Sequence, residues 1–387
     1  MSLVIYEIKK LFNIKSIMIT LLGALLIWFL FIDFDIEYFP NGIGEKDAFN
    51  ISEEMLKNYG TTVDEKEFED FISSTKKVEK ELNKEILNNE TMIKYGIKNY
   101  KELKVFEENI FKDHMTEEEQ KAFNEITNFI IDNELSRIIE ERNRIIESYK
   151  GINEDIPYLL ENLSNRALER YREVKGTKER TSPLSYGILN NYNNIIISIL
   201  GLAIVTVFFM VSPIFIEDKK SKVNYLQYSS KKGRDVFKSK LIAGFLTTII
   251  VTSIEMLIIG LIYSTNNTFQ FWNCSVNSIF VFQEPLWFDM TFGQYIIITM
   301  FFVYIIAMIT GVISMYVSSK VNSYITLIGV NIVILGIVFY LGFIGIDNFG
   351  TIYAPKFLQL SIYALFLVII VVLSFIILKN RKMKVLD

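Results

Sequence analysis

GQYIIITMFFVYIIAMITGVISMYV, residues 293–317, is a run of 25 residues without a charged side chain. An α-helix of this length rises about 37 Å, which exceeds the ~30 Å hydrocarbon core of a bilayer. The run therefore predicts a transmembrane helix, and with it a membrane protein.

Further apolar runs lie on both sides of this one. The first of them has 17 residues, close to the shortest length that crosses a bilayer. A cleaved signal peptide is the alternative for that run, but it lacks a small-residue cleavage site and is followed by acidic and aromatic residues. A retained span is expected. We predict an all-α membrane protein with six transmembrane helices, the other five covering residues 16–32, 195–216, 241–263, 323–343 and 357–378.

Charge is distributed unevenly between the connecting segments. The N-terminus, residues 217–240, Lys320 and the stretch after residue 378 together hold 16 Lys and Arg, whereas residues 264–292 and 344–356 hold one, Lys356. Basic residues accumulate on the cytoplasmic side of short loops. Both termini are therefore expected in the cytoplasm and residues 33–190 outside. The chain has a single cysteine and so no intrachain disulfide, which favours a bacterial plasma membrane for a protein with so large an exported domain.

Residues 33–190 carry 23 Lys and Arg against 35 Asp and Glu. A capping box, Thr116 to Glu119, starts an apolar stripe that continues to about residue 150, and a second helix is expected over 155–175 with Pro157 in its first turn. Earlier helices are expected near 52–59, 64–89 and 98–113, and a linker from Ser182. The stripe predicts a helix-on-helix core, with a ligand groove as the alternative. The acidic excess predicts a solvated surface, with a cationic peptide partner as the alternative.

Residues 1–13 have the spacing of an amphipathic helix. Val4, Ile8, Leu11 and Phe12 share one face, while Glu7, Lys9 and Lys10 lie elsewhere. Such a helix would lie along the inner membrane surface and turn into the first span. A disordered basic tail is the alternative.

Few polar side chains fall inside the predicted spans. Glu255 is the charged residue among them, and an unpaired carboxylate at that depth is costly, so it is expected to face protein or water. It serves either a substrate path or a hydrogen bond to another span, with Asn331 as a possible partner. Pro213 should kink the second span near its inner end.

Residues 215–241, FIEDKKSKVNYLQYSSKKGRDVFKSKL, form the long cytoplasmic loop. Its eight basic residues would fix topology and contact anionic lipid. The arrangement also resembles the permease subunits of type-2 ABC exporters, in Gram-positive style with a large outer domain. In that family a Glu after the second span precedes a small helix, a Ser-rich turn, Gly-Arg and a Lys that opens the third span. The matching positions here are Glu217, Tyr225, Leu226, Tyr228, Ser229, Ser230, Gly233, Arg234 and Lys240.

The resemblance implies an N-terminal elbow helix and a coupling loop, 217–240, that dock on an ATP-binding subunit. The chain has no GxxxxGK[ST] loop, so ATP and Mg are expected in that partner and no cofactor in this chain. A second permease copy or a sibling permease, and membrane lipid, are further expected partners; nucleic acid is not. The cargo would be hydrophobic or amphipathic, such as a drug, an antimicrobial peptide or a lipid-like molecule.

Two other functional classes were compared with transport. A membrane sensor or scaffold, whose outer domain binds a ligand or peptide, is the alternative. An enzyme is disfavoured because the spans contain neither paired carboxylates nor His, and one His and one Cys make no His/Cys metal site.

Overall fold

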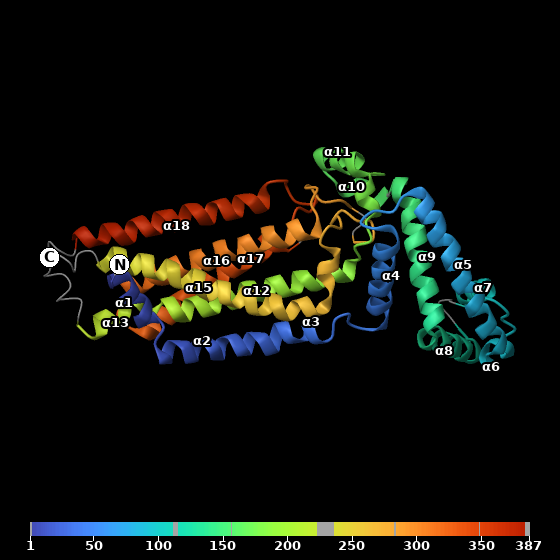
Figure 1. The fold of residues 1–387 in the computed structure, drawn as a ribbon, viewed down its shortest axis with the longest axis horizontal. Coiled ribbons are helices and arrows are strands. Elements are labelled where there is room, and N and C mark those ends of the chain that lie inside the picture. Colours follow the sequence, from blue (N-terminus) through green and yellow to red (C-terminus); the bar gives the residue numbers. More distant parts are fainter. Residues whose placement is uncertain are drawn as a thin grey trace.

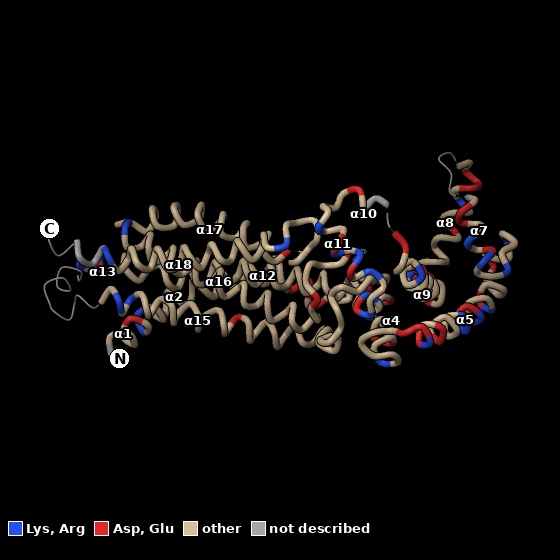
Figure 2. The backbone as a smooth tube through the Cα atoms, turned by 90° about the horizontal axis from the view of Figure 1, so that it is seen from above, with Lys and Arg blue, Asp and Glu red and all other residues tan. Residues whose placement is uncertain are grey.

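The computed structural model describes residues 2–110, 115–155, 157–222, 236–281, 284–347 and 349–383. Within these ranges the chain is helical, with two isolated β-bridges and no strand. The helices form two parts: an apolar bundle, and a charged helical domain at one end of it (Figures 1 and 2). The predicted all-α class is confirmed.

Six helices in the described ranges are long and apolar enough to cross a membrane. This matches the number of predicted spans and supports a multi-pass membrane protein. The first span consists of α2 (Ile14–Ile27), a π-helical turn (Trp28–Ile32) and α3 (Asp33–Glu37). The others are α12 (Tyr186–Val211) continued by α13 (Pro213–Lys220), α15 (Val236–Tyr263), α16 (Phe292–Lys320), α17 (Tyr324–Ile346) and α18 (Leu358–Met383).

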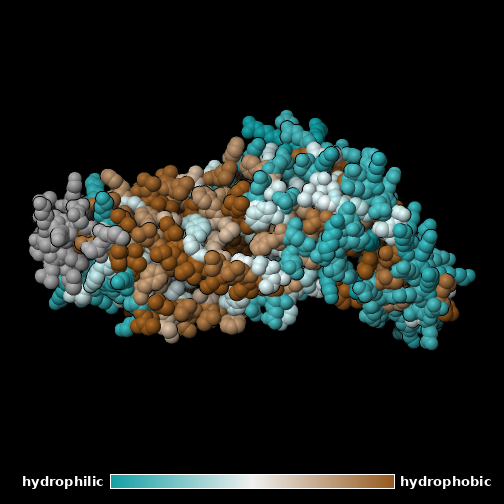
Figure 3. Space-filling view, in the orientation of Figure 1, coloured by the Kyte–Doolittle hydropathy of each residue, from teal (hydrophilic) through white to brown (hydrophobic). Residues whose placement is uncertain are grey.

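Helices α12 and α16 are the centre of the bundle. Their apolar segments are 72% and 67% buried, whereas those of the first span and α18 are 6% and 17% buried. The outer helices instead present large apolar side chains, such as Phe29 and Val371, to the surroundings. These side chains form the apolar belt of Figure 3. A belt of this size is typical of a surface covered by lipid or by another protein.

The charged helical domain has its own cores. One is built around Leu82, Leu103 and Ile126, and another around Phe71 and Ile146. Capping boxes start two of its helices, Asp64 with Glu67 and Thr116 with Glu119, as predicted for the second pair. Its α-helices are α4 (Ile43–Tyr59), α5 (Glu65–Asn88), α6 (Glu90–Lys94), α7 (Tyr100–Ile110), α8 (Glu117–Asp132), α9 (Glu134–Lys150), α10 (Pro157–Asn162) and α11 (Asn165–Val174).

Two predicted elements of this domain are shorter than expected. The apolar stripe of 116–150 is divided between α8 and α9 at Asn133, whose side chain caps α9 by accepting a hydrogen bond from the Ser136 amide. The helix predicted over 155–175 is likewise divided, because Ser164 caps a new helix, α11. Pro157 does stand in the first turn of α10.

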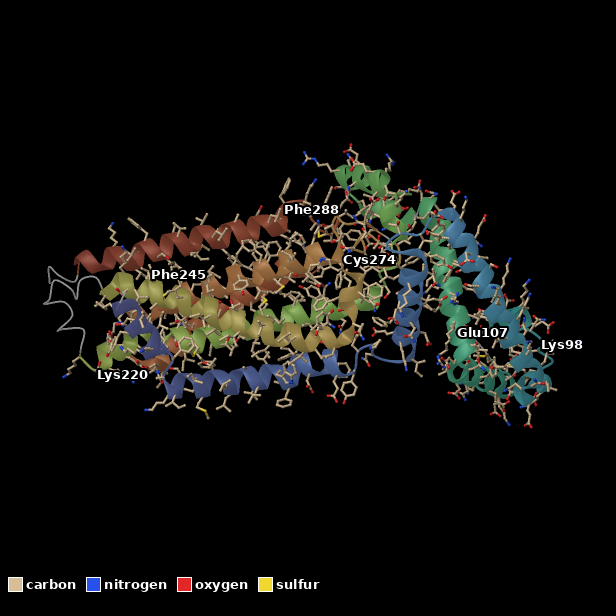
Figure 4. The ribbon with its side chains drawn as sticks, in the orientation of Figure 1. Lys98, Glu107, Lys220, Phe245, Cys274 and Phe288 are labelled. Carbon is tan, nitrogen blue, oxygen red and sulfur yellow. The ribbon has the colours of Figure 1, made fainter. Side chains whose placement is uncertain are left out.

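The segment from Ser182 is not a free linker. Ser182 is buried, accepts a hydrogen bond from the Ser275 amide (2.9 Å) and a second one, at its carbonyl oxygen, from the Ser278 hydroxyl (2.6 Å). Arg180 beside it donates to the carbonyl oxygen of Asn277 (3.0 Å). The loop between α15 and α16, where Figure 4 places Cys274 and Phe288, is therefore packed against the base of the helical domain.

Candidate functional site

The candidate site lies at the basic end of the bundle, opposite the helical domain. Figure 2 shows Lys and Arg gathered there, around α13 and α1 (Ser2–Leu11). The chain leaves α12 at Val211 and starts α13 at Pro213, whose ring suits the first position of a helix. The kink predicted at Pro213 is thus a break between two helices.

Helices α13 and α16 cap one another. The Ser318 hydroxyl accepts hydrogen bonds from the backbone amides of Phe215 (3.3 Å) and Ile216 (3.2 Å), near the start of α13. In return, Lys219 Nζ donates to the carbonyl oxygens of Ser318 (3.2 Å), Ser319 and Val321 (both 2.8 Å), at the end of α16. A cation at a helix C-terminus also interacts favourably with the helix dipole. The second and fourth spans are therefore fastened together at this end.

Four charged side chains from three helices form a buried network beside α13. Lys240 Nζ on α15 contacts Glu7 Oε2 of α1 at 2.9 Å and Asp218 Oδ2 of α13 at 2.7 Å. It also donates to the carbonyl oxygen of Ile214 (2.5 Å), and Lys10 of α1 pairs with Asp218. We call Glu7, Lys10, Asp218 and Lys240 the ion network.

Three of the four side chains in the ion network are shielded from solvent. The side chains of Lys240, Glu7 and Asp218 are 2%, 4% and 7% exposed. Among the described residues, two carboxylates face two ammonium groups, of which Lys10 is 26% exposed. A buried charge with its partner removed is strongly destabilising. The network therefore fixes α1, α13 and α15 relative to one another.

The predicted coupling residues are placed only in part. Glu217 is half-buried and outside the ion network, whereas its neighbour Asp218 belongs to the network. Lys240, matched to the Lys that opens the third span in the permease family, is the centre of the network. The remaining predicted residues lie outside the described ranges: Tyr225, Leu226, Tyr228, Ser229, Ser230, Gly233 and Arg234.

The N-terminal residues form a helix, α1, and not a coil. Of its predicted apolar face, Leu11 is buried, and Val4, Ile8 and Phe12 are half-buried. Glu7, which was expected away from the apolar face, is almost completely buried, with its carboxylate against Lys240 of α15. A signal was present in the sequence: Glu7 is the single acid among the first 32 residues and stands three positions before Lys10.

The predicted pairing of Glu255 with Asn331 is wrong. Figure 2 shows α15 and α17, which carry them, on opposite edges of the bundle. Asn331 is fully buried and donates to the Leu327 carbonyl of its own helix (2.8 Å). Glu255 instead lies beside Thr206 of α12 and lines a groove between α2, α12 and α15.

Among the described residues, no group of three or more His, Cys, Asp or Glu side chains could hold a metal ion. Comparison with models of known protein families, with characterised proteins and with solved structures finds no match.

Proposed function

We propose that this chain is the membrane-spanning permease subunit of an ATP-driven ABC exporter. It would move a hydrophobic or amphipathic substrate, with ATP and Mg bound and hydrolysed in a separate subunit. The bundle would lie in a bacterial plasma membrane, both termini in the cytoplasm and residues 33–190 outside. A second permease copy or a sibling permease would complete the pathway.

The ion network is the observation that carries this proposal. It joins α1 to α13, where the 217–240 loop begins, and to α15, where the loop ends. A partner that binds α1 and this loop would act on three helices as one body. Because α13 is also fastened to α16 through Ser318 and Lys219, its displacement would reach the buried centre of the bundle. This is the mechanical connection that a coupling surface requires.

The apolar surface supports the proposed class of cargo. The grooves along the bundle are lined mostly by aliphatic and aromatic side chains. Such surfaces suit a substrate that partitions into the membrane rather than an ion or a sugar.

Purification of the full-length chain from its native membrane tests the proposal. An ATP-binding subunit is expected to co-purify and to hydrolyse Mg-ATP, and Arg234→Glu in the coupling loop is expected to weaken its binding. Lys98→Glu makes the same charge change at the far tip of the helical domain, where Figure 4 labels Lys98, and should leave binding intact. Absence of an ATPase, or equal binding by both variants, would contradict the proposal.

One feature favours the sensor alternative. Near the tip of the helical domain, Tyr95, Phe106, Glu118 and Glu119 line a cleft of about 360 Å³ between α7 and α8. Aromatic and acidic side chains together suit a cationic peptide. A protein that binds such a peptide but never an ATPase would be a sensor.

A further inference from the structure

A membrane-facing groove runs between α2, α12 and α15, separate from the ion network. Its cavity volume is about 480 Å³, within the range of small-molecule sites. Leu25 of α2 and Ile254 of α15 stand at its edges with about half of their surface exposed. The groove is thus open on the side that the apolar belt presents to lipid.

Two polar atoms inside this groove have no hydrogen-bond partner among the described residues. Glu255 and Thr20 both line it. Glu255 Oε2 and Thr20 Oγ1 are each buried from solvent, and neither makes a hydrogen bond. The Thr206 hydroxyl is within hydrogen-bonding reach of the Glu255 carboxyl and also donates to the Leu202 carbonyl (2.9 Å), which leaves Glu255 Oε2 as the carboxyl atom without a partner. The groove therefore offers a carboxylate oxygen and a hydroxyl to an occupant.

A second groove on the same bundle shows what is unusual about the first. It lies between α12 and α17, has a volume of about 530 Å³ and is lined by side chains such as Phe208, Ile332 and Phe339. None of its lining residues is charged. A hydrocarbon chain would therefore be a sufficient occupant of this second groove. The acid in the first groove is the feature that distinguishes the two.

We infer that the groove between α2, α12 and α15 binds a lipophilic cation that enters from the membrane, with Glu255 as its counter-ion. The occupant has an apolar body that fills the groove and a positive charge that meets the carboxylate. A cation would stabilise the ionised form of this buried carboxyl, whereas a neutral lipid chain or an anion would not. Opposite charges attract more strongly in this low-dielectric setting than in water, and ionisable groups within spans are commonly placed on substrate paths.

That the cation is also a cargo rests on the proposed exporter function; the binding itself does not. Because the carboxylate would hold the cation part-way across the bundle, this groove would be the first binding site on a path that the substrate enters from the membrane. The substrate class then narrows from hydrophobic or amphipathic molecules to those that carry a positive charge.

Equilibrium binding to the purified full-length chain in lipid nanodiscs tests the inference. The probe is tetraphenylphosphonium, and tetraphenylborate is the control of nearly the same shape and opposite charge. Wild type is expected to bind the cation over the anion, and Glu255→Gln to lose at least about tenfold in affinity for the cation. Unchanged size-exclusion elution and helix content show that the variant is folded.

A pair of groove-filling variants locates the site. Ala24→Leu adds bulk to the groove that contains Glu255, and should weaken cation binding. Gly336→Leu adds bulk to the second groove, where a Cβ would meet no atom within 4 Å, and should leave binding unchanged.

Equal cation binding by wild type and Glu255→Gln would overturn the inference, as would equal loss in the two filling variants. Its failure is distinct from failure of the exporter proposal. If an ATPase co-purifies but cation binding does not depend on Glu255, only the inference about the groove is rejected. If cation binding depends on Glu255 but no ATPase co-purifies, the inference about the groove stands and the exporter proposal is rejected.

Discussion

At the scale of single residues, Lys240 determines whether α1 stays attached to the bundle. Its ammonium group is the shared partner of Glu7 and Asp218, and the three side chains are almost completely buried. Removing one member of such a network leaves uncompensated charge in the protein interior, whereas the intact network adds little to stability over apolar packing. The network therefore sets which helices pack together, and loss of one of its members destabilises that packing.

Lys240→Met is expected to destabilise the bundle by roughly 3–5 kcal/mol, because the buried Glu7 carboxylate loses its ammonium partner and Asp218 loses one of its contacts. The loss should appear as a lower midpoint of thermal unfolding in detergent and as faster proteolysis near α1. Lys238→Met is the matched control, since Lys238 stands on the same helix but is exposed. Equal midpoints for the two variants would mean that the network does not hold α1.

Which acid joins this network could not be read from the sequence. Glu217 and Asp218 are adjacent, so their side chains point about 100° apart on a helix, and the direction that faces α15 depends on how α13 packs. The resemblance to exporter permeases assigned Glu217 to ATPase coupling and predicted no ion pair; the acid that contacts Lys240 is Asp218. Lys240 was found because its position matched the family pattern. The contact between Glu7 and Lys240 was not predicted, because the two residues stand 233 positions apart and no local pattern encodes it.

At the scale of elements, α13 and α16 are held together by reciprocal capping. Both ends are short of backbone partners, as the first amides and last carbonyls of any helix are. Ser318 supplies an acceptor to one end and Lys219 a donor to the other. The ends of two spans are satisfied by each other instead of by water, which makes α13 an extension of the bundle rather than part of a loose loop.

Ser318→Ala is expected to release the start of α13. A net hydrogen bond contributes about 1 kcal/mol, so amide exchange at Phe215 and Ile216 should accelerate roughly fivefold. Hydrogen–deuterium exchange with peptide resolution measures it. Ser319→Ala is the matched control because its hydroxyl donates within α16, to the Tyr316 carbonyl. The same acceleration in both variants would exclude capping of α13 as the cause.

Helix positions were largely predictable, whereas breaks and contacts between elements were not. Runs of uncharged residues located the six spans, because their cause is local composition. The helix divides at Asn133 because its side chain caps α9. The apolar stripe runs past this residue and therefore does not show where one helix ends and the next begins. The attachment of Ser182 to Ser275 and Ser278 joins segments more than 90 residues apart, which no local pattern encodes.

At the scale of the whole molecule, three zones follow one another along its long axis. The basic end with α1 and α13 comes first, the apolar belt second and the charged helical domain last (Figures 2 and 3). A membrane around the belt would separate the two ends by its full thickness. The excess of Lys and Arg at the basic end favours that end as the one that faces the cytoplasm.

The side of each end can be measured with cysteine labelling in whole cells. Cys274 gives little background, because burial raises the pKa of its thiol from 9.0 to about 11, and the neutral thiol is a poor nucleophile at pH 7. Glu118→Cys at the exposed start of α8 should react with a membrane-impermeant maleimide in intact cells. Lys220→Cys at the exposed end of α13 should react only after permeabilisation.

Each of the two positions is the control for the other, because both side chains are exposed but lie at opposite ends of the molecule. The reverse pattern would place the helical domain in the cytoplasm. An ATPase would then have to reach α1 and α13 from outside the cell, where ATP is scarce, so the exporter proposal would fall with it. The lipophilic-cation groove would survive, because it lies within the belt and is open to lipid in either orientation.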